Sequence, residues 1–272
     1  MRILFLGDVV GRKGREIALK QIPLLKKDMA IDVVIVNAEN AAHGFGLTPK
    51  MYEAFKNVGA DLMTMGNHTF DKKDIFPVLM EKTDIIRPIN YPEGTIGSGS
   101  TIYTLPDGRK LGLIQVLGQT FMKNNDAPYP FLDAFYNKNK LGQDIQAIVV
   151  DVHAEATSEK MAMGFLSDGR ASLVAGTHTH IPTADAMILP KGTGYITDIG
   201  MCGDYWSIIG MTTETVLPRF MGQGTERMEP AEEQGTLCAV FIETDDETGL
   251  CKRMFPIRIG AHLINASKAE TG

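Results

Sequence analysis

The chain has 272 residues, of which 44% are hydrophobic and 22% charged, and this composition predicts a globular protein with a sizeable core. Its formal net charge of -6 excludes a protein that holds nucleic acid by a broad basic surface, although bound metal could supply a positive field for a small phosphorylated substrate. Three cysteines without a CxxC pair argue against a disulfide framework, and no apolar run reaches the roughly 18 residues of a membrane span, so we expect a cytoplasmic protein.

The first ninety residues alternate strand and helix signals. A turn at Gly11–Gly14 is expected before a helix over 15–27, and Thr48-Pro49 opens a second helix with proline at its first position. A third helix should begin near Lys72. Apolar runs predict strands over 2–7, 32–36 and 61–65. This βαβαβα pattern predicts a mainly parallel sheet.

The second half carries two hairpin signals and further strand–helix pairs. Turn residues at 106–108 and 245–249 each separate two apolar runs. We expect 118–143 to form a long loop with a short helix, a candidate wall of the site. Further elements are predicted as strands over 146–152, 172–175 and 194–198, a helix over 154–165 and an exposed loop over 221–233. A single domain is expected over 1–272, with halves at 1–90 and 100–262 and a frayed tail at 263–272.

Polar side chains follow five of the predicted strands. Ligands in an open α/β sheet bind at the carboxyl ends of its strands, so these side chains should converge. Carboxylate, carboxamide and imidazole together suit transition metals better than Mg²⁺ or Ca²⁺, and the absence of cysteine disfavours a structural zinc site. Their number suits two ions rather than one. The side chains are Asp8, Glu39, Asn40, Asn67, His68, His153, His178 and His180.

Several sequence blocks in this order resemble one protein family. The blocks are GDVVGRKGR, NAENAAHGFG, MGNHTFD, RPINYP, DVHAEATSEK, GTHTHIPTAD and YITDIGMCG, and they span residues 1 to about 203. They are similar to the YmdB-like bacterial metallophosphoesterases of the calcineurin-like superfamily. The general superfamily begins with DxH and usually has aspartate where this chain has Glu39. The YmdB-like branch shares both departures, with Asn40 in the vacant ligand position.

The resemblance implies a role for each of these residues. Three side chains would bind one metal, namely Asp8, Asn40 and His180. Three others would bind the second metal, namely Asn67, His153 and His178. Glu39 would bridge the two ions, and His68 would be the general acid that protonates the leaving oxygen.

The resemblance also implies a fold and an activity. The fold would be a four-layer αββα sandwich, with two mixed β-sheets packed face to face and helices outside. The activity would be hydrolysis of phosphodiesters, 2′,3′-cyclic nucleotides among them, by a metal-bridging hydroxide. For the two metal ions, iron would be favoured over manganese, and manganese over zinc. Members are described as homo-oligomers, and some are linked to RNA turnover. We expect a small cyclic-nucleotide partner, no stable nucleic-acid complex and no membrane.

Other assignments remain open at this point. The chain could be a phosphomonoesterase of the same fold, or a metal-dependent regulator that binds a cyclic nucleotide or a protein partner. A zinc amidohydrolase is disfavoured because its HxH motif comes on the first strand, whereas here it comes late. Among the remaining side chains, His43 is expected in a loop near the mouth and His262 in a solvated tail. Three carboxylates are expected to orient loops or ligand histidines, namely Asp71, Glu155 and Asp185.

Overall fold

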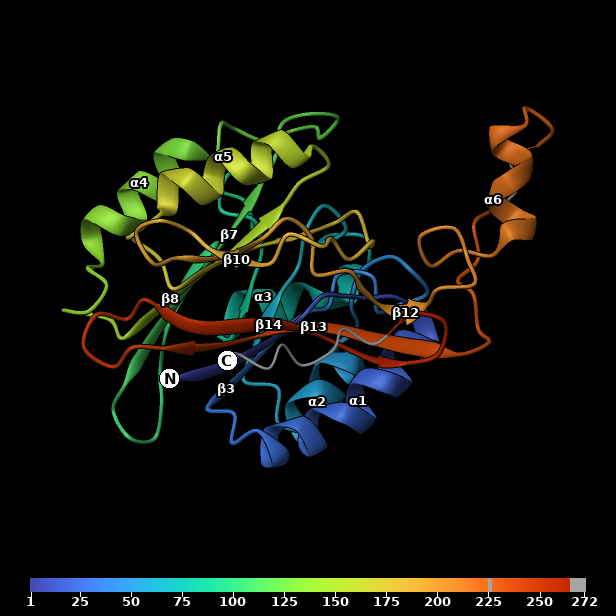
Figure 1. The fold of residues 1–272 in the computed structure, drawn as a ribbon. Helices are drawn as coiled ribbons and strands as arrows, with labels where there is room; N and C mark the ends of the chain where they lie inside the picture. Colours follow the sequence, from blue (N-terminus) through green and yellow to red (C-terminus); the bar gives the residue numbers. More distant parts are fainter. Residues whose placement is uncertain (225–226, 265–272) are drawn as a thin grey trace.

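The computed structural model describes residues 1–224 and 227–264 of the chain. Two β-sheets pack face to face, with α4 and α5 outside one sheet and α1 and α2 outside the other (Figure 1). This arrangement confirms the predicted four-layer α/β sandwich. The helices are α1 (Gly11–Asp28), α2 (Pro49–Asn57), α3 (Phe76–Glu81), α4 (Tyr129–Lys138), α5 (Thr157–Ser167) and α6 (Thr213–Phe220), with a short 3₁₀ turn η1 (Lys73–Ile75).

Both sheets mix parallel and antiparallel strands. The eight-stranded sheet runs β2 (Asp8–Val9), β12 (Met201–Asp204), β13 (Gly235–Thr244), β1 (Arg2–Leu6), β3 (Val33–Asn37), β4 (Leu62–Thr64) and β5 (Ile85–Ile86), with β14 (Cys251–Gly260) paired to β13. The six-stranded sheet runs β10 (Met187–Ile188), β11 (Gly194–Ile196), β9 (Leu173–Thr177), β8 (Ala147–His153), β7 (Lys110–Leu117) and β6 (Ser100–Thr104). Strands β1, β3, β4 and β5 pair in parallel, as the βαβαβα pattern predicts.

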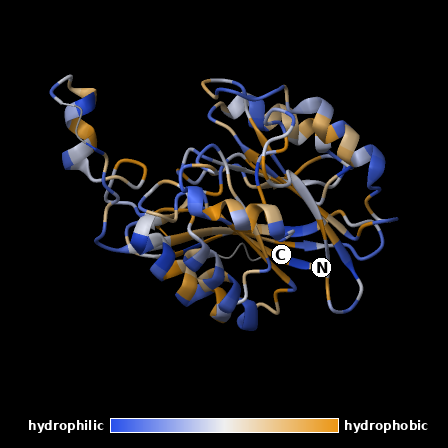
Figure 2. Ribbon diagram, turned by 180° about the vertical axis from the view of Figure 1, so that it is seen from behind, coloured by the Kyte–Doolittle hydropathy of each residue, from blue (hydrophilic) through white to orange (hydrophobic). Residues whose placement is uncertain are grey.

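The central strands are buried on both faces, which explains their unbroken apolar sequences. In β1, Ile3 and Phe5 point into the layer between the sheets, where they join residues of β7, β8 and β9. Leu4 and Leu6 point the other way and pack against α1 and α2. A third apolar cluster fills the space between the six-stranded sheet and α4 and α5. The hydrophobic colouring therefore concentrates in the strands and on the inner faces of the helices (Figure 2).

Both predicted hairpins are confirmed, and most predicted helices lie close to their observed bounds. β6 pairs with β7, and β13 with β14, in antiparallel register. Thr48 caps α2 by accepting a hydrogen bond from the backbone nitrogen of Met51, with Pro49 at the start of the helix. The expected frayed tail falls mostly on residues outside the described ranges. Within those ranges, no helix is both long enough and apolar enough to cross a membrane.

One local expectation is wrong, and one helix was not predicted. Gly11–Gly14 is the first turn of α1 and no separate turn precedes the helix. The physical reason is close packing, because a Cβ on Gly14 would lie 2.1 Å from the carbonyl oxygen of Cys202 in β12. The sequence pattern also did not predict α6, which stands out from the body of the molecule (Figure 1).

Candidate metal centre

All eight candidate side chains lie at one edge of the sandwich, just beyond or at the carboxyl ends of parallel strands. Two sheets contribute, so residues far apart in the chain meet between them. Asp8 follows β1, while Glu39 and Asn40 follow β3, and Asn67 and His68 follow β4. From the other sheet, His153 ends β8, and His178 and His180 follow β9.

His153 is the centre of one half of the cluster. Its Nε2 atom lies 3.0 Å from Glu39 Oε1, 2.9 Å from Asn67 Oδ1 and 3.2 Å from His178 Nδ1. Glu39, His153 and His178 each offer a ligand atom, and these atoms all lie within 4.8 Å of one another. Ligand atoms at these mutual distances could hold a metal ion between them.

Asp8 is the centre of the other half. Its Oδ1 atom lies 3.9 Å from His180 Nε2 and 3.9 Å from His153 Nδ1, while its Oδ2 atom accepts a hydrogen bond from the backbone nitrogen of His178 at 3.1 Å. Asn40 turns its amide nitrogen to the carbonyl of Gly44 at 2.8 Å, which leaves its side-chain oxygen free to face the cluster. The two halves therefore adjoin through Asp8 and His153.

Three buried oxygens in this cluster accept no hydrogen bond of good geometry within the described ranges, namely Asp8 Oδ1, Glu39 Oε1 and Asn40 Oδ1, although Glu39 Oε1 lies 3.0 Å from His153 Nε2. A buried oxygen without a partner costs free energy unless something else satisfies it. Cations bound between carboxylate, amide and imidazole groups would satisfy all three. The donor set therefore fits divalent transition-metal ions.

The electrostatics of the cluster agree with a cation site. Burial raises the pKa of Glu39, but the charge of His153 outweighs it and holds the pKa at about 2, so Glu39 is an anion. Burial lowers the pKa of His153, but Glu39 outweighs it and raises this pKa to about 9, so without metal the protonated ring takes the place of a cation beside Glu39. A metal ion bound by His153 would displace this proton. Burial, with the nearby charge of His153, lowers the pKa of His178 to about 3. His178 is therefore neutral at neutral pH, which is the form that coordinates metal.

Gly66 allows the ligands to approach the chain closely. A Cβ placed on this residue would lie 2.2 Å from Glu39 Oε2 and 2.6 Å from His153 Nε2. No side chain fits in that space, so only glycine permits the two ligands to meet over the end of β4. The motif MGNH thus contains a packing requirement that a list of candidate ligands does not reveal.

The turn that carries His178 and His180 has unusual backbone geometry. Both residues have positive φ, at 91° and 65°, which non-glycine residues seldom adopt. A buried network holds the turn, because Asp198 accepts hydrogen bonds from the backbone and hydroxyl of Thr179 at 3.2 and 2.6 Å. Lys160, itself fully buried, neutralises this carboxylate at 2.7 Å. The network thus sits behind the turn and limits its movement.

Neighbouring groups orient the ligand rings. Thr177 Oγ1 lies 2.8 Å from His153 Nδ1 and donates to Asp151 at 2.7 Å. This chain fixes the ring so that Nε2 faces the cluster. Glu155 lies 3.2 Å from His178 Nε2, as expected for an orienting carboxylate.

The other two carboxylates also lie where an orienting role was expected. Asp71 lies 2.8 Å from His68 Nδ1, so the ring is held from the side opposite its Nε2 atom. Asp185 instead accepts hydrogen bonds from Thr183 and Thr197, at 2.6 Å from Thr183, and so orients a loop.

A cavity of about 390 Å³ opens directly onto the cluster. Its floor includes Glu39, Asn40, His178 and His180, and His68 lies on its wall. The remaining lining is largely apolar and comes from the loop at 44–45 and the segment 208–228. Residues of the 118–143 loop do not contribute to this lining, so its expected role as a wall is not supported.

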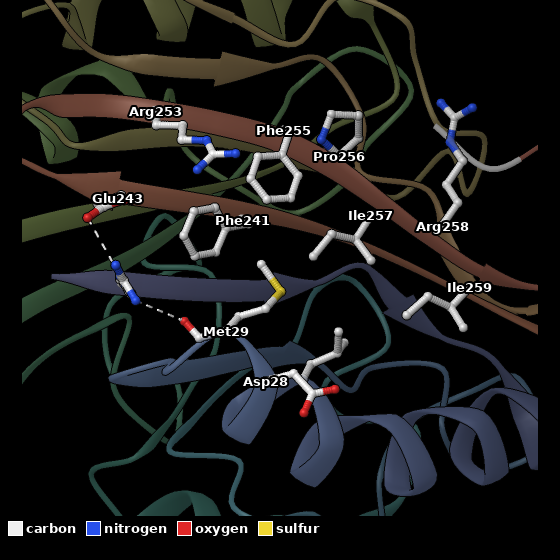
Figure 3. Close-up of a pocket in the computed structure, with 12 residues that line it drawn as sticks. Asp28, Met29, Phe241, Glu243, Arg253, Phe255, Pro256, Ile257, Arg258 and Ile259 are labelled. Atoms are coloured by element: carbon white, nitrogen blue, oxygen red, sulfur yellow. Dashed lines mark hydrogen bonds and ion pairs between the residues drawn. The ribbon is translucent and has the colours of Figure 1, made fainter. Parts of the chain in front are cut away.

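A separate hollow of about 510 Å³ lies on the outer face, between the end of α1 and the strands β13 and β14 (Figure 3). Arg2 lines it, with an ion pair to Glu243 at 3.6 Å and a hydrogen bond to the carbonyl of Met29 at 3.4 Å. None of the candidate metal ligands lines this hollow. The cavity of about 390 Å³ beside the cluster is therefore the candidate substrate site.

The two remaining histidines lie outside the cluster. His262 was expected to be solvated and is not, because its ring stacks on Trp206 at 4.0 Å and its side chain is only 8% exposed. His43 is exposed and lines a different surface hollow, next to Thr212 and Met228.

The sequence patterns did not indicate Gly66, the Asp151–Thr177 pair or the apolar wall on α6. Apolar residues at helical spacing, Val216 with Phe220 and Leu217 with Met221, are the signal that could have indicated α6.

Comparison with known proteins places this geometry in a family. A family model described as YmdB-like protein matches residues 4–257. A 2′,3′-cyclic-nucleotide 2′-phosphodiesterase of Bacillus subtilis (strain 168) is 49% identical over 248 residues, which cover 91% of this chain and 93% of that protein.

Two solved structures have the same fold throughout. The crystal structure of a hypothetical protein from Thermus thermophilus has a TM-score of 0.89 and 40% identity, covering 96% of this chain and 99% of that one. The crystal structure of a phosphatase from Mycoplasma pneumoniae also has a TM-score of 0.89, with 37% identity, covering 96% of this chain and 93% of that one. With the motif blocks, the fold and the family model in agreement, the chain belongs to the YmdB-like protein family.

Proposed function

We propose that this protein is a metal-dependent phosphodiesterase that opens 2′,3′-cyclic nucleotides. The observation that carries the proposal is that buried carboxylate and amide oxygens meet histidine side chains beside an open cavity, which Glu39, Asn40, His178 and His180 line. The name of the Bacillus relative supports the substrate class. Iron or manganese is the proposed metal, and a homo-oligomer in the cytoplasm is the proposed setting.

Seven residues are proposed to hold two metal ions. Asp8, Asn40 and His180 would hold one ion, and Asn67, His153 and His178 the other, with Glu39 shared between them. When bound, such a pair of ions supplies an activated water molecule and a positive field for the phosphoryl oxygens. Both oxygens of Glu39 are held in place, since Oε1 lies 3.0 Å from His153 Nε2 and Oε2 accepts the backbone N–H of His68 at 2.9 Å.

His68 is proposed to supply the proton for the leaving oxygen. Its side chain is 26% exposed and lines the cavity, so substrate can reach the ring. Asp71 accepts from Nδ1–H, which leaves Nε2 on the substrate side, and the protonated form of the ring carries the Nε2–H that the leaving oxygen would take. In the reaction one water molecule is consumed, the bond between phosphorus and O2′ breaks, and O2′ takes the proton. The product is a nucleoside 3′-monophosphate.

The direct test is hydrolysis of 2′,3′-cAMP by purified, metal-loaded protein under single-turnover conditions. We expect stoichiometric conversion to 3′-AMP. Bis-p-nitrophenyl phosphate should be hydrolysed faster than mono-p-nitrophenyl phosphate, since a phosphomonoesterase would show the reverse order. Tight binding of the cyclic nucleotide without any product would favour the regulatory alternative and overturn the proposal.

Metal content gives an independent prediction. Protein purified without chelator and refilled with iron or manganese should contain close to two metal ions per chain, because seven ligand-type side chains exceed what one ion uses. Elemental analysis measures this ratio. A value below about one and a half in a fully refilled sample would contradict the two-metal arrangement. The chelated protein should lose activity and regain it on refilling.

A further inference from the structure

The cavity beside the cluster has two chemically distinct ends. One end is the polar floor formed by the candidate ligands, and the other is an apolar wall. The wall is formed by Phe45 from the loop after β3 and by Ile209, Met211 and Phe220 from the segment that includes α6. Since a phosphodiester at the ligands must extend into the same cavity, its organic part meets this wall.

The wall is structurally tied to the candidate metal centre. Ile209 has a positive φ of 49°, and its carbonyl oxygen lies 2.7 Å from His180 Nδ1. Ile208 and Met211 exchange two backbone hydrogen bonds, at 2.8 and 3.0 Å, which close the turn that presents these side chains. The part of the wall at residues 208–211 therefore shares one local structure with His180. Phe220 lies at the end of α6 and is 80% exposed, so its ring is open to a ligand.

The loop of Gly44 and Phe45 completes the wall from the opposite side. A Cβ on Gly44 would lie 2.4 Å from Met211 Cε, so the two segments pack in direct contact. Phe45 meets the ring of His68 edge to face, with 5.0 Å between ring centroids. An aromatic side chain of the wall thus lies next to the proposed acid, and a second, Phe220, lines the same cavity.

We propose that this apolar wall is a nucleobase subsite, with Phe220 and Phe45 as its aromatic surfaces. The inference rests on the proposed phosphodiesterase function and adds how the substrate is selected. The cavity volume of about 390 Å³ is within the range of small-molecule sites. A base attached to the ribose of a cyclic phosphate would leave water for the wall while the phosphate lies at the polar floor.

The composition of the wall determines which substrates the subsite would favour. Apart from Arg219, the side chains of the wall are apolar, so the base is held by stacking and burial instead of hydrogen bonds to its edge. Stacking tolerates every base because each has an aromatic face. We therefore expect the enzyme to require a base while accepting all four, with rates for adenine and uracil within about tenfold of each other.

The experiment compares nucleotide and base-free substrates. Wild-type protein is assayed with 2′,3′-cAMP, 2′,3′-cUMP and 1-O-methylribose 2′,3′-cyclic phosphate, which lacks a base. The nucleotide should exceed the base-free compound in kcat/KM by about ten- to a hundredfold, the usual contribution of one stacked base. Phe220→Ala should lower this ratio by about tenfold.

Leu217→Ala is the matched control. Leu217 lies on the same helix and is 49% exposed, but it does not line the cavity. Its replacement should leave the ratio at the wild-type value. A fall of the same size in both variants would indicate general damage to α6 and would overturn the assignment of Phe220.

Calorimetry separates this inference from the proposed activity. Metal-loaded protein is titrated with 3′-AMP and with ribose 3-phosphate, and the subsite predicts at least about tenfold tighter binding of 3′-AMP. If no cyclic phosphate is hydrolysed but this preference remains, the activity fails and the subsite stands. If both products bind equally and the base-free compound is hydrolysed as fast as the nucleotides, the subsite fails and the activity stands.

Discussion

Replacing His68 with alanine is expected to lower turnover of a 2′,3′-cyclic nucleotide by about 10²–10⁴-fold, the usual contribution of a general acid. The leaving O2′ would have to depart without a positioned proton donor. Metal content should not change, because the contact between this residue and Glu39 is made by the backbone N–H at 2.9 Å, which alanine retains. Single-turnover kinetics and elemental analysis of the same sample measure both quantities.

Asp71→Asn provides the comparison for this variant. Asp71 lies 2.8 Å from His68 Nδ1 and is exposed, so its loss should slow turnover by less than the loss of the ring itself. A leaving group that needs no proton, such as p-nitrophenolate, should reduce the effect of His68→Ala. Loss of metal with unchanged activity per bound ion would show that His68 supports the metal site and does not act as an acid.

Replacing Gly66 with alanine is expected to displace the side chains of the candidate metal site that pack against this residue. The added Cβ would lie 2.2 Å from Glu39 Oε2 and 2.6 Å from His153 Nε2, so at least one side chain must move. Displacement of a reacting group by about 1 Å can cost about 10²-fold in rate, and disturbance of groups that support ligands costs about 10–100-fold in metal affinity. We therefore expect a fall of at least about 100-fold in activity with weakened binding of metal.

Gly224→Ala is the matched control, because its Cβ would meet nothing closer than Pro218 Cβ at 3.9 Å. It should behave as wild type in both measurements. Circular dichroism of the metal-free variants should show that Gly66→Ala still folds, since the clash involves side chains of the site. Full metal occupancy and a wild-type rate in Gly66→Ala would mean that Glu39 and His153 do not act together at this position.

The candidate site was largely accessible from the sequence because parallel strands align their carboxyl ends. Each candidate ligand follows an apolar run, and the carboxyl ends of the parallel strands of one sheet lie at the same edge. Glu39, His153 and His178 accordingly lie within 4.8 Å of one another, although 139 residues separate the first from the last. What the pattern could not provide was the support beneath the ligands, such as Gly66 and Asp198.

The misplaced features share a different cause. Gly11 and Gly14 were interpreted as a turn because glycine favours turns, yet here Gly14 lets α1 approach Cys202. His262 was expected to be solvated because its sequence neighbours are polar, but Trp206, 56 residues earlier, covers its ring. Both depend on contacts between segments that no local sequence window contains.

By itself, the sequence determined the alternation of buried strands with helices, both hairpins and the identity of the residues that converge at the strand ends. The spacing of apolar residues and the residue types of turns depend on only a few neighbouring residues, so a short stretch of sequence predicts them. Only the tertiary structure decided how the second sheet brings His153 and His178 against Glu39, and how the segment with α6 forms a wall beside them. Those features arise from close packing between distant segments, which depends on the whole fold.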